Sequence, residues 1–250
     1  MRTIFYGALL AIFVTPSVEA AEIVVLSPPL VRDGLNDLAG DYARQTGITV
    51  TVKSDVMGKI MADIETATPA ADVIILPPDL MDTLEKNGGV KPGTRAKLGR
   101  VEIGLAVPAG APHPDISTVA QLSSALRSAK MVVYSKPGPP RNSVEAGIID
   151  TILKQPEFTG VHSTPVETGS GIMALVHGEG DMAMQVIPEI TPHKEVELVG
   201  PLPAKLGAHI DTAIAISARS GDAPDAQAFI RYVMSPHAKA VWKVKGLDRF

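Results

Sequence analysis

Short apolar runs alternate with helical patterns after residue 22, and this alternation restricts the fold more than any other feature. IVVLS (23–27), ITVTV (48–52) and DVIIL (72–76) are rich in β-branched residues, which is typical of strands buried on both faces of a parallel sheet. A helical spacing of apolar residues follows, as in Leu35 and Leu38 after the first run. Strands that alternate with helices make right-handed crossovers, so the sequence predicts an α/β fold with an open, mostly parallel sheet.

A proline-rich segment, PAGAPHPD, follows the strand predicted at 100–107. The alternation restarts beyond it, with a helix predicted at 117–127 and a strand predicted at MVVYS (131–135). The strand predicted at 209–217 and the two helices after it cannot form a core alone, so we expect them to return to the first unit. The predicted fold therefore has two lobes, each an open, mostly parallel sheet with helices on both faces, joined by two crossing segments. The predicted boundaries are a signal peptide at 1–20, lobe 1 at 21–108 and 206–250, and lobe 2 at 109–205.

The first residues, MRTIFYGALLAIFVTPSVEA, have the layout of a secretory signal peptide, with a basic start, an apolar run and small residues ending at Ala20. The apolar run from Ile4 to Val14 is too short for a transmembrane helix, which needs ~20 apolar residues. The chain has no cysteine, which excludes disulfides, thiolate metal sites and a lipid-anchored cysteine. We expect cleavage near Ala20 and a free protein in a bacterial periplasm.

The charged residues do not favour nucleic acid or an anionic membrane as a partner. The formal net charge is -4, and acidic and basic residues are mixed along the chain without a basic block. The six histidines never occur at i and i+4 beside a carboxylate, and no phosphate loop or dinucleotide fingerprint is present. We expect a monomer that binds no metal, no cofactor and no nucleic acid.

A proline-rich loop precedes a helical pattern in YSKPGPPRNSVEAGIID (134–150), and Arg141 stands at the join. Helix N-termini carry unpaired N–H groups and a partial positive charge, so they attract anions and disfavour a cation. An anion between the helix start and Arg141 removes this conflict. The alternative is an exposed loop arginine without a ligand role.

Four longer stretches resemble a known family. They are PAADVIILPPDLMDTLEKNGGVKPGTR, GRVEIGLAVPAGAP, HGEGDMAMQ and DAQAFIRYVMSPHAKAVWKVKGL. In this order they are similar to the periplasmic solute-binding proteins of ABC importers, specifically the branch of molybdate-binding proteins, over nearly all of 22–250. The resemblance implies a type 2 periplasmic binding fold, with a hinge, an anion in the cleft between the lobes and an ABC permease in the inner membrane as partner.

The ligand positions that the resemblance implies carry different residues in this chain. Pro29 stands where molybdate-binding relatives have a serine, and Val56, Met57 and Gly58 stand where a second serine cluster is expected. Gln185 or a neighbour replaces a tyrosine often found there. A tetrahedral oxyanion held by neutral groups needs many N–H and O–H donors, so these replacements disfavour molybdate.

Proline also lacks an amide hydrogen, and Pro28, Pro29, Pro139 and Pro140 all lie near the expected ligand. Arg141 supplies donors that these prolines cannot, because its guanidinium pairs bidentately with a carboxylate. We therefore predict a small organic di- or tricarboxylate as the ligand, with a molybdate- or tungstate-type oxyanion as the alternative.

The other polar candidates have both a structural and a ligand interpretation. Ser27 is interpreted as a helix cap beside the cleft, and Asn142 as a cap with Glu145 as its capping-box partner. Lys59 is either a counter-charge or an exposed helix residue, and Ser170 lies in a turn that can present N–H groups to an anion. The predicted ligand-binding residues are Ser27, Pro29, Met57, Gly58, Lys59, Pro78, Arg141, Asn142, Ser143, Ser170, Gly171 and Gln185.

Three classes of function fit these observations. The favoured class is a binding protein without catalytic residues, whose ligand-closed form docks on a permease. A secreted hydrolase has little support, because the sequence contains no G-x-S-x-G, H-E-x-x-H or S-x-x-K pattern. A sensor subunit that passes its closed form to a membrane receptor would use the same closure, and the sequence does not separate it from the first class.

Overall fold

The structure is a computed structural model, and it describes residues 22–68, 70–138, 143–167 and 169–250. The predicted signal peptide and the predicted ligand residues Arg141 and Asn142 lie outside the described residues.

The elements of the described residues follow the predicted alternation. The strands are β1 (Glu22–Ser27), β2 (Thr49–Ser54), β3 (Val73–Leu76), β4 (Ala96–Pro108), β5 (Val132–Ser135), β6 (Ser163–Val166), β7 (Met182–Val186), β8 (Val196–Pro201), β9 (His209–Ile216) and β10 (Leu247–Asp248). The α-helices are α1 (Arg32–Thr46), α2 (Met57–Thr66), α3 (Pro78–Lys86), α4 (Val119–Ser128), α5 (Val144–Leu153), α6 (Gly171–Val176), α7 (Ile187–Ile190), α8 (Ala223–Val233) and α9 (Pro236–Val244). The short 3₁₀ helices are η1 (Pro29–Val31), η2 (Pro156–Phe158) and η3 (Ala204–Leu206).

The strands follow one path, β2-β1-β3-β9-β4-β7-β5-β6, with β8 and β10 both paired to β4. β1 runs parallel to β2 and β3, and β5 runs parallel to β6 and β7. β9 and β4 join these two groups through antiparallel pairs. The part built around β1–β3 is called lobe 1 below, and the part built around β5–β7 is called lobe 2.

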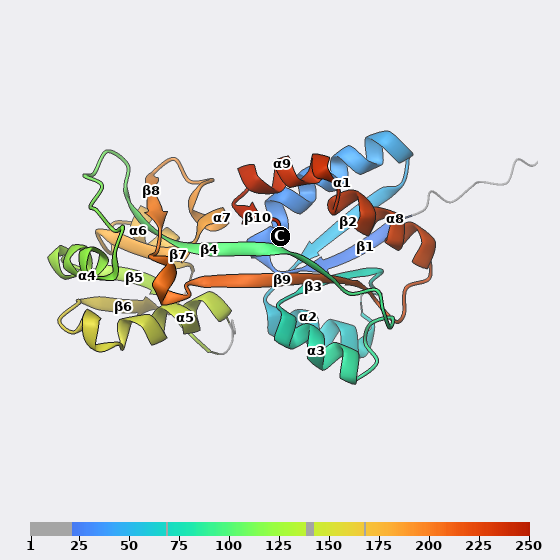
Figure 1. The fold of residues 1–250 in the computed structure, drawn as a ribbon, viewed down its shortest axis with the longest axis horizontal. Helices are drawn as coiled ribbons and strands as arrows, with labels where there is room; N and C mark the ends of the chain where they lie inside the picture. Colours follow the sequence, from blue (N-terminus) through green and yellow to red (C-terminus); the bar gives the residue numbers. More distant parts are fainter. Residues whose placement is uncertain (1–21, 69, 139–142, 168) are drawn as a thin grey trace, which may run out of the picture.

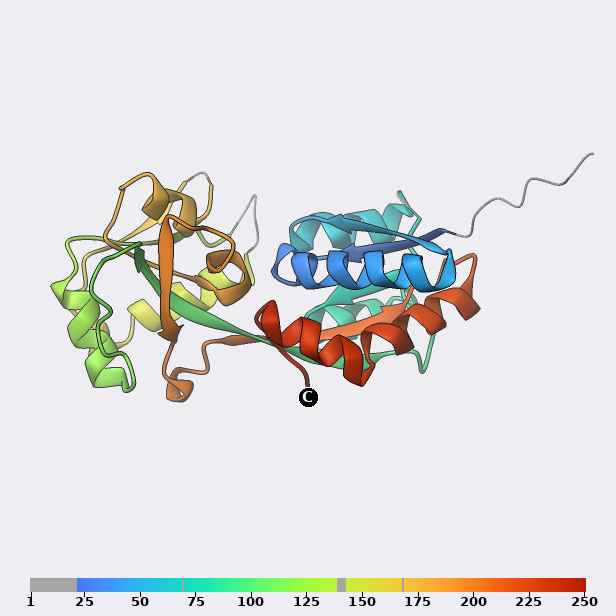
Figure 2. The same ribbon diagram turned by 90° about the horizontal axis from the view of Figure 1, so that it is seen from above.

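Figures 1 and 2 show the two lobes side by side, with β4 and β9 running between them. In lobe 1, helices α1, α8 and α9 cover one face of the sheet, and α2 and α3 cover the other. The predicted α/β fold with two lobes and two crossing segments is confirmed. The exact residue boundaries predicted for the lobes stay a prediction. β8, β10 and α7 were not predicted from the sequence.

The core of lobe 1 closes around Trp242 of α9, which has no exposed surface. Its indole Nε1 donates to the carbonyl oxygen of Val233 at 2.9 Å, so the buried polar atom is satisfied. Gly34 of α1 lets the helix approach this ring, because a Cβ atom there would lie 2.6 Å from it. This contact packs α1 against α9 beside the sheet.

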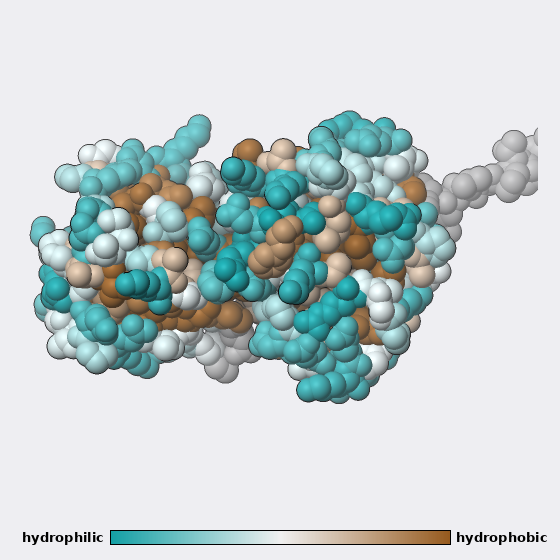
Figure 3. All heavy atoms as spheres, in the orientation of Figure 1, coloured by the Kyte–Doolittle hydropathy of each residue, from teal (hydrophilic) through white to brown (hydrophobic). Residues whose placement is uncertain are grey.

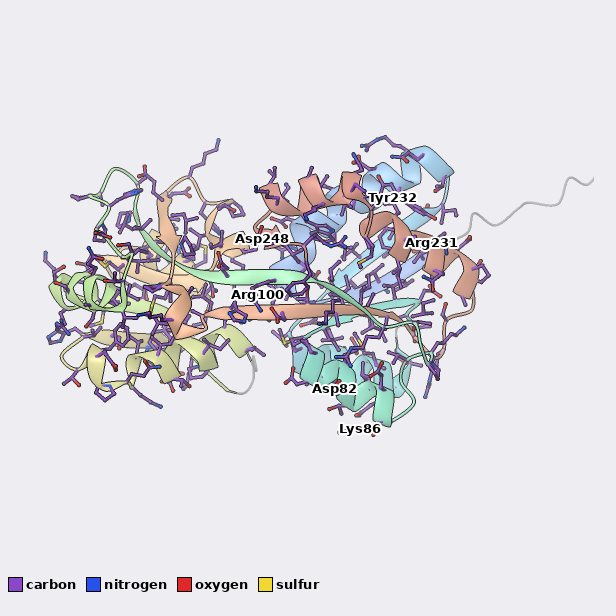
Figure 4. All side chains as sticks on the ribbon, in the orientation of Figure 1. Asp82, Lys86, Arg100, Arg231, Tyr232 and Asp248 are labelled. Atoms are coloured by element: carbon purple, nitrogen blue, oxygen red, sulfur yellow. The ribbon has the colours of Figure 1, made fainter. Side chains whose placement is uncertain are left out.

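An ion pair joins the crossing strands β4 and β9 on the lobe 1 side of the molecule. Arg100 of β4 and Asp211 of β9 are register partners, with Nε to Oδ1 at 2.6 Å and Nη2 to Oδ2 at 3.0 Å. The guanidinium carbon lies 5.7 Å from the centre of the Phe250 ring. Figure 4 shows Arg100 on the green strand β4 near the middle of the molecule. This bidentate pair keeps the two crossing strands together where they leave lobe 1.

The outer surface is polar in most places. On the face shown in Figure 3, hydrophilic residues dominate around α2 and α3, while hydrophobic residues are visible between the helices of lobe 2. Within the described part of the chain, every helix falls short of the length or the apolar character that spanning a bilayer would require.

Candidate functional site

A pocket of about 130 Å³ lies between the two lobes, where strands of both lobes end. Its lobe 1 residues come from the segment after β1 and from the start of α2. Its lobe 2 residues come from the end of β5, the starts of α5 and α6, and the β7–α7 junction. The lining residues are Pro28, Pro29, Leu30, Val56, Met57, Ser135, Ser143, Glu145, Ser170, Gln185 and Glu189. Ligands of open α/β sheets bind at such carboxyl ends of strands, which is the position predicted for the cleft.

The lobe 1 side of this pocket, called the apolar wall below, carries no polar side chain. Pro28 and Pro29 lead from β1 into η1, and neither has a backbone N–H to offer. Val56 and Met57 begin α2, whose N-cap makes no side-chain hydrogen bond, and Met57 is 5% exposed. The apolar wall can therefore contact a carbon skeleton through its side chains, but its side chains cannot donate hydrogen bonds.

The lobe 2 side, called the polar wall below, carries only polar side chains. Two of its serines are helix caps. Ser143 Oγ accepts from the N–H of Ala146 at 3.3 Å at the start of α5, and Ser170 Oγ accepts from the N–H of Met173 at 3.3 Å at the start of α6. The remaining N–H groups of a helix start and its partial positive charge favour a negatively charged ligand. The polar wall is therefore suited to oxygen atoms of an anion.

A buried hydrogen-bond chain lies behind these caps. The Ser135 hydroxyl oxygen receives the N–H of Gly171 and the side-chain amide of Gln185, each at 3.4 Å. The same Gln185 amide nitrogen donates to Glu189 Oε2 at 2.9 Å, and Gln185 Oε1 accepts from the N–H of Val186 at 3.2 Å. Ser135 and Gln185 are 3% and 1% exposed, so this chain holds its polar atoms in fixed directions beside the pocket.

The start of α6 is pressed against the end of β5. A Cβ atom at Gly171 would lie 2.6 Å from the Cα atom of Tyr134, so only glycine fits at this position without displacement. The Tyr134 hydroxyl donates to Asp150 of α5 at 3.3 Å. Burial, together with the charge of Asp150 and the hydrogen bond to it, raises the pKa of Tyr134 to about 12. Tyr134 therefore stays neutral, and it links β5 to α5 through Asp150 and to α6 through the contact with Gly171.

Two carboxylates face the pocket from the polar wall. Glu189 of α7 accepts from Gln185 as described, and Glu145 lies in the first turn of α5. Both side chains are partly buried. Carboxylates in the pocket wall repel the negative oxygen atoms of an anion. A ligand of this pocket therefore needs other groups to face Glu145 and Glu189.

The structure brings five of the predicted ligand residues to this pocket. They are Pro29, Met57, Ser143, Ser170 and Gln185. Gly171 lies directly behind it, since its N–H donates to Ser135. The prediction centred on Arg141 falls on a residue that the structure does not describe, and the same holds for Asn142.

Other predicted residues lie elsewhere. Gly58 follows Met57 in α2 but does not line the pocket. Lys59 forms an ion pair with Asp63 one turn along α2, so its charge is used on the helix surface. Pro78 begins α3 and lines a separate concavity beside the crossing strands.

Two capping predictions were wrong. Ser27 caps no helix, because η1 begins after Pro28 without a side-chain cap, and the fully buried Ser27 hydroxyl pairs with Ser54 at 3.1 Å. Asn142 is not the cap of α5 either, since Ser143 occupies the N-cap and bonds the N–H of Ala146. The register of the helix start is thus one residue later than predicted, which places Glu145 in the pocket wall.

Sequence reasoning missed Ser135 and Glu189 as pocket residues. Ser135 ends the predicted strand MVVYS, so its position at a carboxyl end was an available signal. Glu189 offered no such signal, because no element was predicted at its position. Across the described residues, no group of three histidine, aspartate or glutamate side chains is placed to hold a metal ion.

Comparisons with known proteins agree with the two-lobed fold. The family model described as bacterial extracellular solute-binding protein matches residues 23–248. The periplasmic molybdate-binding protein of Azotobacter vinelandii has a similar structure, with a TM-score of 0.66 and 19% identity over 90% of this chain and 98% of that one. The sulfate-binding protein SubI of Mycobacterium tuberculosis gives a TM-score of 0.71 and 17% identity over 92% of this chain and 87% of that one. An aconitate isomerase from a Pseudomonas species is 25% identical over 99% of this chain and 96% of its own length.

Proposed function

This chain belongs to the bacterial extracellular solute-binding proteins, and from that premise we propose that it captures a small organic di- or tricarboxylate between its lobes. The two walls of the pocket carry the proposal. The polar wall offers hydroxyls and helix starts to carboxylate oxygens, and the apolar wall offers hydrocarbon surface to the carbon atoms between them. Burying polar atoms without hydrogen bonds is costly, so a ligand that is polar on all sides fits the apolar wall poorly.

An inorganic oxyanion is the runner-up ligand. Two structural neighbours are described as molybdate-binding and sulfate-binding proteins, and both share the fold at under 20% identity. Such an ion has oxygen atoms on every side, and Pro28, Pro29 and Met57 would face one of those sides without a side-chain donor. The organic anion therefore uses both walls, whereas the oxyanion uses one.

We place the protein in the periplasm, after removal of residues 1–20, with an ABC permease as its partner. The support for this placement is the signal-peptide pattern and the family to which the chain belongs. Ligand that contacts both lobes would favour the closed arrangement, and a permease would distinguish that arrangement from the open one.

Thermal unfolding with a ligand panel tests the proposal. A ligand that binds only the folded state stabilises it by RT ln(1 + [L]/Kd), which is about 2.7 kcal/mol at a hundredfold excess over Kd. The dialysed protein would be heated with succinate, malate, citrate, aconitate, molybdate, tungstate, sulfate and phosphate. We expect a raised Tm with at least one carboxylate and none with the inorganic ions. A shift with molybdate or sulfate alone would reject the carboxylate ligand.

A second candidate function is isomerisation of an unsaturated tricarboxylate. The specific support is the 25% identity to an aconitate isomerase along 99% of the chain, together with two carboxylates in the pocket. Moving the double bond of aconitate requires one proton to leave the methylene carbon next to the double bond and one to arrive at the far alkene carbon. Glu145 or Glu189 could take the first proton and return it at the second carbon, so no cofactor is needed for balance.

Proton NMR of aconitate incubated with the protein separates the two functions. An isomerase converts the cis isomer to the trans isomer and, in D₂O, introduces deuterium at the reprotonated carbon whenever the glutamate exchanges its proton with solvent before returning it. Both changes should fall at least ~100-fold in the Glu145→Gln, Glu189→Gln double variant if a glutamate is the base. Tight binding of aconitate with neither change would reject catalysis and leave the binding function in place.

A further inference from the structure

We propose that the ligand carries a hydroxyl group beside its carboxylates, and that Glu145 accepts the hydrogen of that hydroxyl. The inference rests on the proposed carboxylate function and narrows it to hydroxycarboxylates. Its basis is the pattern of donors and acceptors along the polar wall.

Glu145 supplies an acceptor without a described partner. Its partly buried side chain lines the pocket from the first turn of α5. Among the described residues, no hydrogen bond or ion pair engages its carboxylate. An ionised carboxylate can only accept hydrogen bonds, so it is satisfied by a ligand that donates one.

Ser135 supplies a donor. Its oxygen already receives two N–H groups, from Gly171 and from Gln185, and a hydroxyl oxygen has two lone pairs. With both lone pairs engaged, the remaining role of this 3% exposed hydroxyl is to donate its own hydrogen. The side chain lines the pocket, so a carboxylate oxygen of the ligand is the acceptor that fits there.

The direction of the Gln185 amide supports this polarity. Its oxygen accepts from the N–H of Val186, which turns its nitrogen toward Ser135 and Glu189. The polar wall therefore presents a hydroxyl donor at Ser135 and a carboxylate acceptor at Glu145 within one pocket. A fully deprotonated oxyanion or a simple dicarboxylate provides only acceptors, whereas a hydroxycarboxylate provides both partners.

Matched ligand pairs that differ by one hydroxyl test the inference. Isothermal titration calorimetry of the mature protein at pH 7.5 and fixed salt would compare malate with succinate, and citrate with tricarballylate. We expect the hydroxyl-bearing member of at least one pair to bind at least about tenfold more tightly. In Glu145→Ala this preference should shrink to less than about threefold. Glu157→Ala is the control, because it removes the same charge from an exposed position of lobe 2 outside the pocket.

Three results would overturn the inference. Equal affinity for both members of each pair would reject the hydroxyl while leaving the carboxylate function intact. An unchanged preference in Glu145→Ala, with both members bound more tightly, would show that Glu145 only repels anions. Binding of sulfate, molybdate or hydrogenphosphate with no carboxylate bound would instead reject the proposed function on which the inference rests.

Discussion

The two walls of the pocket differ in every side chain that they contribute. Lobe 1 places prolines, aliphatic residues and a methionine against the ligand space, and lobe 2 places serines, a glutamine and glutamates there. Both lobes have the same architecture of parallel strands and covering helices, so the fold does not account for the difference. Recognition of polar groups by side chains therefore belongs to lobe 2, while the side chains of lobe 1 supply shape and exclude water.

The largest expected effect is the loss of the tight contact behind the polar wall. Gly171→Ala places a methyl group 2.6 Å from the Tyr134 Cα atom, so we expect unfolding free energy to fall by about 1–3 kcal/mol. Carboxylate binding should weaken as well, since α6 must move. Urea denaturation measures the first effect and calorimetry the second.

Gly147→Ala is the matched control, because no atom lies within 4 Å of a Cβ at that position of α5. Alanine is a better helix former than glycine, so this variant should be unchanged or slightly more stable. If both glycine variants lost stability equally, the close packing of α6 on β5 would not be the cause.

Removing the donor from the polar wall should weaken binding next most strongly. Ser135→Ala leaves a ligand oxygen without its hydrogen bond, which corresponds to about 1–3 kcal/mol, or roughly fivefold to 150-fold in Kd. Ser128→Ala removes a hydroxyl that donates to the Ala125 carbonyl on α4 and lies outside the pocket, so its Kd should match that of the unmodified protein. Calorimetry gives both values, and an unaltered Kd in Ser135→Ala would contradict its donor role.

The apolar wall should contribute less, and only for ligands that contain carbon. Met57→Ala removes hydrocarbon from the pocket, so we expect organic carboxylates to bind about tenfold more weakly. Met61→Ala, one turn later on the same helix and outside the pocket, should leave binding unchanged. A loss of affinity in Met61→Ala as large as that in Met57→Ala would place the effect in helix stability instead of ligand contact.

The smallest effect concerns the crossing strands, which belong to both lobes. The Arg100 guanidinium lowers the pKa of Asp211, so the pair stabilises the fold above the ordinary aspartate pKa and loses that contribution as the pH falls through the lowered value. Both side chains are more than a third exposed, so the contribution should stay below about 1 kcal/mol.

Asp211→Asn should therefore reduce the unfolding free energy slightly at pH 7 and make it fall less steeply below about pH 4. Denaturant titrations at pH 7, 5, 4 and 3 measure this difference. Parallel curves for the variant and the unmodified protein across this range would contradict the role assigned to the pair.

Most of the fold was predictable because buried strands and amphipathic helices leave periodic patterns. IVVLS and MVVYS became β1 and β5, and the spacing of Leu35 and Leu38 became α1. β8 and β10 were missed, since both are ordered by pairing with β4 instead of by a pattern of their own. Contacts of this kind depend on residues far away in the chain, and local patterns do not encode them.

The candidate site was predictable where it followed from strand ends and helix starts. Helix starts pointed to Ser143 and Ser170, whereas Met57 came from the family resemblance. The rule on strand ends would have found Ser135 had it been applied to the strand at 131–135. Glu145 was interpreted as a capping-box partner, because its role depends on whether the N-cap of the helix is residue 143 or the residue before it. A shift of one residue in the helix start decides whether the Glu145 carboxylate caps the backbone of α5 or lines the pocket.

The separation of polar and apolar walls also sets an order of events. A ligand that meets the open protein finds its side-chain hydrogen-bonding partners on lobe 2 alone, so these side chains make the first polar contacts. The prolines and methionine of lobe 1 then act mainly by slowing escape. Substitutions on lobe 2 should therefore alter the association rate as well as the residence time, whereas those on the apolar wall should alter residence time alone.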